Sequence, residues 1–114
     1  MKDILSELNK TSGVLGSAVL APDGLVIARQ ASTALASEEL WQQALKAFGA
    51  FSDISESSGC GQATAVTMEW SHGRLFARAV PGGILLAATR GDVPLGQVQT
   101  AVEQAAAELQ GDGG

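Results

Sequence analysis

The sequence predicts one α+β domain in which helices sandwich an antiparallel five-stranded sheet, with elements in the order α-β-β-α-β-β-β-α. Three features predict it: a hairpin signal near the start, three consecutive strand-like segments after the middle, and three helical segments around them. At 114 residues the chain is long enough for one domain and too short for two. We expect residues 1–110 to form that domain and the Gly-rich residues 111–114 to form a flexible tail.

The first elements are a short helix and a hairpin. A helix is predicted over residues 2–10, because three apolar side chains share one face. They are Ile4, Leu5 and Leu8. The hairpin follows over residues 14–31, and its turn reads Pro-Asp-Gly. Pro22 pre-sets φ in this turn, and Gly24 takes the left-handed conformation that closes it.

The central helix is predicted over residues 38–58, with Ser37 as its N-cap. Its apolar side chains cover more than the arc of roughly 100° that a helix facing one sheet requires, so we expect it to have two apolar neighbours. We assign one stripe to the sheet, namely Leu40, Ala44, Ala47, Phe51 and Ile54. We assign a second stripe to a partner interface, namely Trp41, Leu45 and Phe48. A position in the core remains the alternative for Trp41.

Three strands and a helix complete the domain. The strands are predicted over residues 62–70, 74–80 and 84–89, and the last is nearly all apolar, as expected of a central strand. The closing helix is predicted over residues 95–110, where apolar residues recur every three or four positions.

The strand over residues 62–70 is expected at an edge of the sheet. It contains no proline and no lysine, and Glu69 is its only charged residue. Natural edge strands of this length are normally protected by charge, proline or a bulge. We therefore expect it to pair with a second copy of the chain through Thr64, Val66 and Met68, which gives an isologous dimer with a continuous sheet.

The composition disfavours several classes of partner and location. A formal net charge of −5 and a pI near 4.6 argue against nucleic acid and anionic membrane surfaces. The single cysteine, Cys60, cannot form an internal disulfide bond. No apolar run is long enough to span a membrane and no leader pattern is visible, so we expect a cytoplasmic protein.

Residues that suggest catalysis occur singly. His72 is the only histidine and lies in a predicted turn, where a solvated side chain is the usual case. Cys60 follows the carboxyl end of a helix, whose dipole does not favour a reactive thiolate. The glycine pairs lack the lysine and hydroxyl residue of a phosphate-binding loop, and no metal-ligand spacing occurs. We expect no catalytic residues, no metal, no cofactor and no enzymatic activity.

The chain resembles the Roadblock/dynein light chain domain family, and within it the compact bacterial regulators of a gliding-motility GTPase. The resemblance covers residues 1–110 and is carried by Gly13-Val14-x-Gly16-(x)6-Asp23-Gly24-Leu25-Val26-Ile27-Ala28, by Gly83-x-Leu85-Leu86-Ala87 and by Leu95-Gly96-(x)5-Val102-(x)6-Leu109. It implies a homodimer in which the strands after the central helices pair and those helices pack together. It also implies a non-catalytic regulator or scaffold of a small Ras-like GTPase, with stimulation of GTP hydrolysis as a candidate activity.

Two other interpretations stay open. One is a small-molecule sensory module, in which Arg74 and Arg78 on one strand face anchor an anionic ligand. The other is a purely structural dimerisation subunit that has no GTPase partner.

Overall fold

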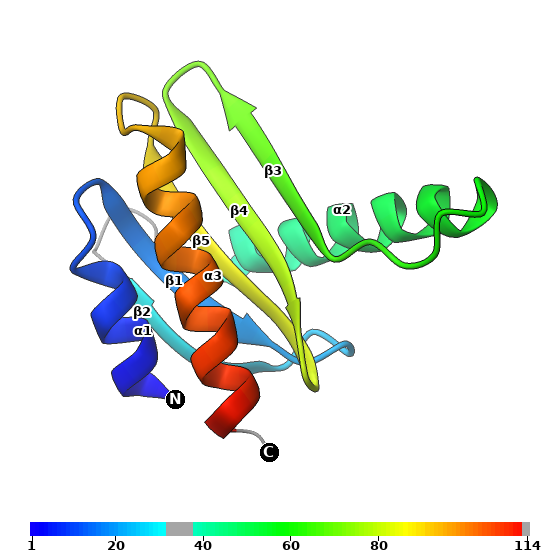
Figure 1. Ribbon diagram of the computed structural model, residues 1–114, viewed down its shortest axis with the longest axis horizontal. Coiled ribbons are helices and arrows are strands. Elements are labelled where there is room, and N and C mark those ends of the chain that lie inside the picture. Colours follow the sequence, from blue (N-terminus) through cyan, green and yellow to red (C-terminus); the bar gives the residue numbers. More distant parts are fainter. Residues whose placement is uncertain (32–37, 113–114) are drawn as a thin grey trace.

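A five-stranded antiparallel sheet forms the centre of the protein, with two helices on one face and one on the other (Figure 1). The structure is a computed structural model that describes residues 1–31 and 38–112. In chain order the elements are α1 (Lys2–Asn9), β1 (Val14–Leu20), β2 (Val26–Ala31), α2 (Glu38–Ser57), β3 (Ala65–Trp70), β4 (Gly73–Val80), β5 (Gly83–Arg90) and α3 (Leu95–Asp112). The predicted fold class and element order are confirmed.

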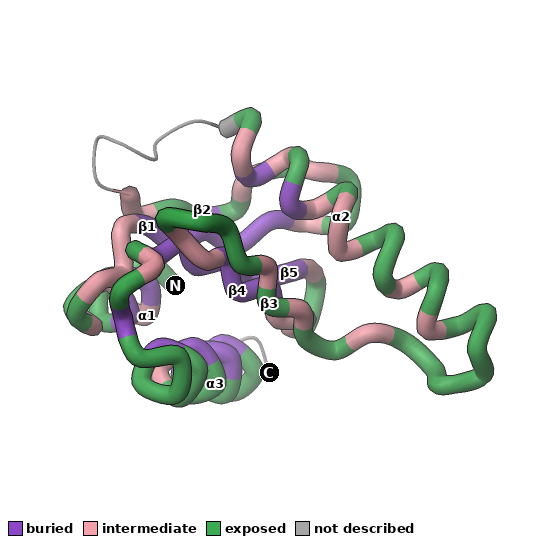
Figure 2. Tube along the Cα trace, turned by 90° about the horizontal axis from the view of Figure 1, so that it is seen from above, coloured by how far each residue is buried: buried purple, intermediate pink, exposed green. Residues whose placement is uncertain are grey.

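The strands lie in the order β2-β1-β5-β4-β3, so β2 and β3 are the two edges of the sheet. The apolar strand β5 is central, and β3 is an edge, as the sequence predicted. Figure 2 views the layers from above, with α2 over one face of the sheet and α1 and α3 over the other.

Some predicted boundaries need correction. β3 begins at Ala65 instead of residue 62, so Thr64 precedes the strand. α3 continues to Asp112 and includes Gly111, whereas the sequence predicts a helix that ends at residue 110. The N-cap expected at Ser37 lies outside the described residues, and the division into a domain and a tail stays a prediction.

The face of the sheet under α1 and α3 holds an aliphatic core. The short helix α1 is held there by Leu5 and Leu8, and α3 by a stripe at three- and four-residue spacing. Its buried members are Leu5, Leu8, Val19, Ala28, Phe76, Leu85, Ala87, Val93, Val98, Val102, Ala105, Ala106 and Leu109.

One buried polar network fixes α1 to the sheet. The Ser17 hydroxyl, fully buried on β1, donates a hydrogen bond to Asn9 Oδ1 over 2.7 Å. The Asn9 amide in turn donates to the Gln30 carbonyl oxygen on β2 over 2.9 Å. Each buried group thus has a partner, which removes the cost of burying it.

The opposite face packs against the first half of α2, and here the sequence assignment of the two stripes is corrected. Trp41 is fully buried and Ala44 nearly so, while Leu45 and Phe48 pack partly buried against the same core. The buried members are Ala18, Leu20, Trp41, Ala44, Leu75, Ala77, Ile84, Leu86 and Ala88.

Two residues that the sequence predicts to face the sheet do not reach it. Phe51 is 44 % exposed and Ile54 is 64 % exposed. The two stripes are neighbours on the helix and similarly apolar, so spacing alone could not decide which of them faces the sheet. The large indole of Trp41 fills the space beneath the helix. Trp41 therefore takes the core position that the sequence left open as its alternative.

We predict that Trp41→Ala lowers the free energy of unfolding by about 3–5 kcal/mol, because it leaves a large cavity between α2 and the sheet. Urea denaturation at fixed protein concentration measures this. Leu25→Ala is the control, because Leu25 is 66 % exposed and its truncation should cost less than about 0.5 kcal/mol. Equal stability of the two variants would contradict the packing described here.

Candidate partner-binding surfaces

The first candidate surface follows the free edge of β3. Val66 and Met68 turn their side chains toward α2 and are half-buried against its core, whereas Thr64 and Thr67 are exposed. Within the described residues no strand lies beyond β3. The structure therefore places the predicted edge residues Val66 and Met68 at an unpaired edge, with Thr64 just before it.

The second half of α2 extends this surface beyond the sheet. In Figure 1 the helix projects past β3, and in Figure 2 its outer turns are mostly exposed. Phe51 and Ile54 lie on this projecting part, and Trp70, at the end of β3, is 54 % exposed. We call β3 together with Ala47, Phe51, Ile54 and Trp70 the edge surface. Exposed apolar side chains gathered at one place mark an interaction site more strongly than scattered ones.

A hollow lies between α2 and β3 within the edge surface. Its volume is about 220 Å³, and apolar side chains of both elements dominate its lining. From α2 these include Leu40 and Ala47, and from β3 Met68 and Trp70; Leu75 of β4 also lines the hollow. Phe51, Ile54 and Trp70 are surface residues that the sequence does not predict as such. The excess of apolar positions on α2 indicates a second neighbour, but spacing alone does not show that Phe51 and Ile54 face it.

The second candidate surface lies on the other side of α2, against the β1–β2 turn. We call it the hairpin groove; it has a volume of about 470 Å³ and is lined by residues of the turn and of α2. Leu45 and Phe48, two of the predicted partner residues, line it, while Trp41 supports the helix from below. Lys46 and Asp23 are exposed at its margin.

Hydrogen bonds hold the two walls of the hairpin groove in place. Gln42 Nε2 on α2 donates to the Gly24 carbonyl oxygen over 2.5 Å. Asp23 Oδ1 accepts from the Leu25 N–H over 3.0 Å, which fixes the turn itself. Gly24 has φ of +95°, and an added Cβ would lie 2.6 Å from Gln42 Oε1. The groove is therefore formed before any partner binds.

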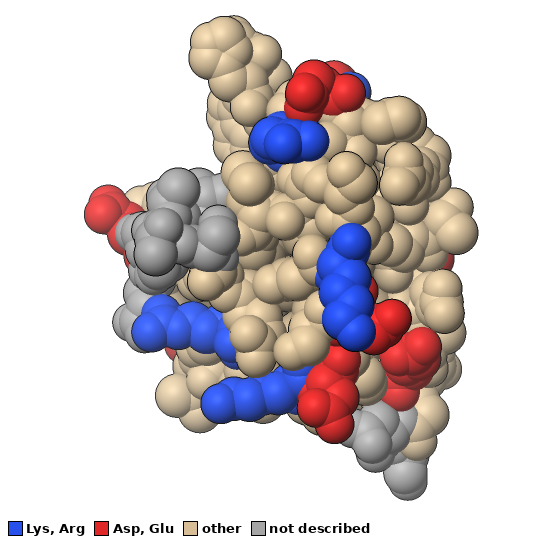
Figure 3. Space-filling model, turned by 90° about the vertical axis from the view of Figure 1, so that its left-hand side faces the viewer, with Lys and Arg blue, Asp and Glu red and all other residues tan. Residues whose placement is uncertain are grey.

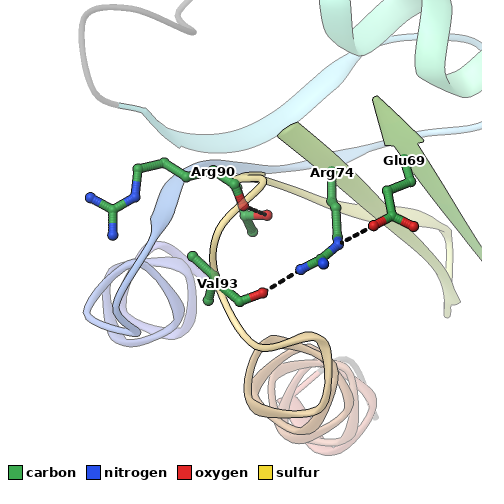
Figure 4. Close-up of polar contacts among 5 residues, drawn as sticks. Glu69, Arg74, Arg90 and Val93 are labelled. Carbon is green, nitrogen blue, oxygen red and sulfur yellow. Dashed lines mark hydrogen bonds and ion pairs between the residues drawn. The ribbon is translucent and has the colours of Figure 1, made fainter. Parts of the chain in front are cut away.

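The arginines of β4 are engaged on the opposite face of the sheet. Arg74 Nε donates to Glu69 Oε1 over 3.0 Å, and Arg74 Nη1 donates to the Val93 carbonyl oxygen (Figure 4). Arg78 Nε lies 3.4 Å from Glu103 Oε1 on α3. Both guanidinium groups therefore have protein partners, and Figure 4 shows Arg90 pointing away from Arg74.

On the side shown in Figure 3, Lys and Arg side chains are distributed over the surface, and Asp and Glu lie beside several of them. His72 and Cys60 are both exposed. In the described ranges no group of three or more His, Cys, Asp or Glu residues is placed to hold a metal ion. No helix in those ranges is long and apolar enough to cross a membrane.

Comparison with solved structures defines the class of fold. A Roadblock/LC7 domain from Streptomyces avermitilis superposes with a TM-score of 0.87 at 13 % identity, covering 97 % of this chain and 95 % of that one. The gliding protein MglB from Thermus thermophilus superposes with a TM-score of 0.83 at 16 % identity, covering 95 % and 84 %. The fold is that of a Roadblock-like domain, similar to that of MglB.

Comparison of sequences gives the family. No protein-family model matches the chain. The uncharacterized protein MJ1340 of Methanocaldococcus jannaschii is 35 % identical over 107 residues, which is 94 % of each chain. The chain therefore belongs to the same family as this archaeal protein.

We predict that Gly24→Ala destabilises the protein by about 0.5–1.5 kcal/mol more than Gly59→Ala, because only the first displaces Gln42 from its hydrogen bond. Gly59 is the matched control: its φ is +79°, so both variants carry similar backbone strain, but a Cβ there meets open space. Urea denaturation of the two variants measures the difference. Equal losses would contradict a fixed hairpin groove.

Proposed function

We propose that the protein is a non-catalytic homodimeric regulator or scaffold that binds a small Ras-like GTPase. The observation that carries the proposal is the apolar edge surface at an unpaired strand, on a fold similar to that of MglB. The two candidate surfaces on opposite sides of α2 suit two different partners.

The edge surface is proposed to bind a second copy of the chain. A free strand edge offers backbone donors and acceptors that an antiparallel strand can satisfy. The projecting half of α2 carries Phe51 and Ile54 past β3, to where the sheet of a second copy would begin. Those side chains would then cover apolar surface of the second copy, and the second copy's helix would do the same in return.

The hairpin groove is proposed to bind the GTPase. Leu45 and Phe48 offer partly exposed apolar surface, and fully buried Trp41 holds the helix that carries them. Lys46 and Asp23 at the margin supply charges of both signs for orientation. Because the groove lies on the side of α2 away from β3, a second copy at the edge surface leaves it open.

Regulation is proposed to act through differential binding. A partner that prefers one nucleotide state of the GTPase shifts its population by at most the difference in affinity between the states. An arginine finger reaches the nucleotide and stabilises the charge of the transition state. Arg74 and Arg78 are instead held on β4 by carboxylates and a carbonyl oxygen. We therefore favour positioning of the GTPase over an arginine finger from this strand.

We predict that Ile54→Asp weakens dimerisation by about tenfold or more, because a charge replaces an apolar side chain at the proposed contact. Light scattering after size-exclusion chromatography, over a dilution series, gives the mass. Leu25→Asp is the matched control, since Leu25 is equally exposed but lies at the β1–β2 turn. A wild-type chain that is monomeric at every concentration would overturn the dimer.

For the GTPase, we predict that Lys46→Glu and Phe48→Ala each weaken binding by about tenfold, through a charge reversal and through loss of an apolar anchor. Titration calorimetry with the organism's Ras-like GTPase, loaded with GDP or a GTP analogue, measures this. Lys2→Glu makes the same charge change on α1 and should bind like the wild type.

Unchanged binding by both groove variants, with the dimer intact, would exclude the hairpin groove. If the wild-type dimer does not bind the GTPase in either nucleotide state, the proposed GTPase binding is wrong, and a purely structural dimerisation subunit explains the protein better.

A further inference from the structure

We propose that two copies of the chain pair through β3 about a two-fold axis that passes midway between Thr67 of one copy and Thr67 of the other. We name each possible axis by the residue that it sets opposite its own copy. The inference rests on the proposed homodimer and adds the register in which its edge strands meet. It follows from which backbone groups of β3 point away from β4.

In an antiparallel pair, residues whose N–H and C=O groups point at the neighbouring strand alternate with residues whose groups point away. The Ala79 N–H donates to the Thr64 carbonyl oxygen over 2.8 Å, so these two residues form a hydrogen-bonded pair. The register between β3 and β4 continues from there without a shift. The residues of β3 whose backbone groups point to the free edge are therefore Ala65, Thr67 and Glu69.

The position of the axis follows from these three residues. An axis through Thr67 sets Thr67 opposite its own copy and Ala65 opposite Glu69 of the second copy. Every outward-facing residue of one strand then meets an outward-facing residue of the other. An axis at Val66 instead sets Glu69 opposite residue 63, and an axis at Met68 sets Ala65 opposite residue 71. Both of these positions lie outside β3. The register centred on Thr67 makes the most backbone hydrogen bonds.

The side chains on the α3 face agree with this register. Thr67 meets its own copy, and threonine pairs across strands are favourable. Glu69 meets Ala65 of the second copy and keeps its 3.0 Å ion pair with Arg74. An axis through Glu69 would set two carboxylates directly opposite each other, which is destabilising.

The α2 face agrees as well. The same register sets Val66 opposite Met68 of the second copy, and both side chains already pack against the core under α2. They would join the two cores across the edge. Phe51 and Ile54, exposed on the projecting half of α2, lie beyond this edge and would cover the joined surface.

Single-cysteine cross-linking tests the register in a Cys60→Ser background, which removes the only cysteine of the chain. Thr67→Cys sets two sulfurs on directly opposed residues, whose Cα atoms lie about 5.5 Å apart, within the range of a disulfide bond. Val66→Cys or Met68→Cys alone places the two sulfurs on diagonally related residues about 7–8 Å apart, which is above that range. A mixture of Val66→Cys and Met68→Cys chains sets them directly opposite again.

After oxidation with copper phenanthroline, we expect most of the Thr67→Cys chain to run at twice the monomer mass on a non-reducing gel. The mixture should also cross-link, while Val66→Cys and Met68→Cys alone stay monomeric on the gel. Light scattering of each variant before oxidation reports the non-covalent state. The Cys60→Ser parent is the control for adventitious cross-linking.

Other results overturn the proposal in distinguishable ways. Preferential cross-linking of Val66→Cys or Met68→Cys with its own copy means a different register, with the dimer retained. A dimer by light scattering that no variant cross-links means that the copies do not meet at β3. Monomers by light scattering without any cross-link mean that the homodimer itself fails.

Discussion

The length of α2 relative to the width of the sheet is the constraint on which the rest of the structure depends. A helix of 20 residues is about 30 Å long, whereas the outer strands of a five-stranded sheet lie about 20 Å apart. A helix of this length that crosses the strands cannot be covered by the sheet along its whole length (Figure 1). Its first half is anchored by fully buried Trp41, so the second half extends past β3 and leaves Phe51 and Ile54 exposed. The unpaired edge and the uncovered helix therefore occur on the same side of the molecule, where one partner can cover both.

The anchoring of α2 also divides its surface between two sides. The side toward β3 carries Ala47 and Ile54 and continues into the edge surface. The side toward the β1–β2 turn carries Leu45 and Lys46, and the Gln42 hydrogen bond to Gly24 keeps it at a fixed distance from the turn. A helix built in this way can hold a second copy on one side and present a preformed groove on the other. No reactive group is needed for such a role, because a scaffold acts through the geometry and affinity of its contacts.

Much of the fold could be predicted from the sequence because its signals are local. The Pro-Asp-Gly turn, the alternation in the strands and the apolar run of β5 identify the elements and place β3 at an edge. The orientation of α2 could not be predicted in the same way. Trp41 and Phe51 belong to neighbouring stripes of similar hydropathy, and only the sheet beneath decides which is buried. The hairpin groove depends on a contact between Gln42 and Gly24, which are 18 residues apart in the sequence. No local sequence pattern predicts such a contact.

Amide hydrogen exchange along β3 tests most directly whether a second strand covers this edge, because each backbone N–H reports its own hydrogen bond. If a second copy pairs there, the amides of Ala65, Thr67 and Glu69 exchange as slowly as those of Val66 and Met68, and they lose this protection on dilution. If the edge is free in solution, exchange alternates along the strand, with those three amides fast at every protein concentration. The second pattern would contradict the account of β3 as an interface.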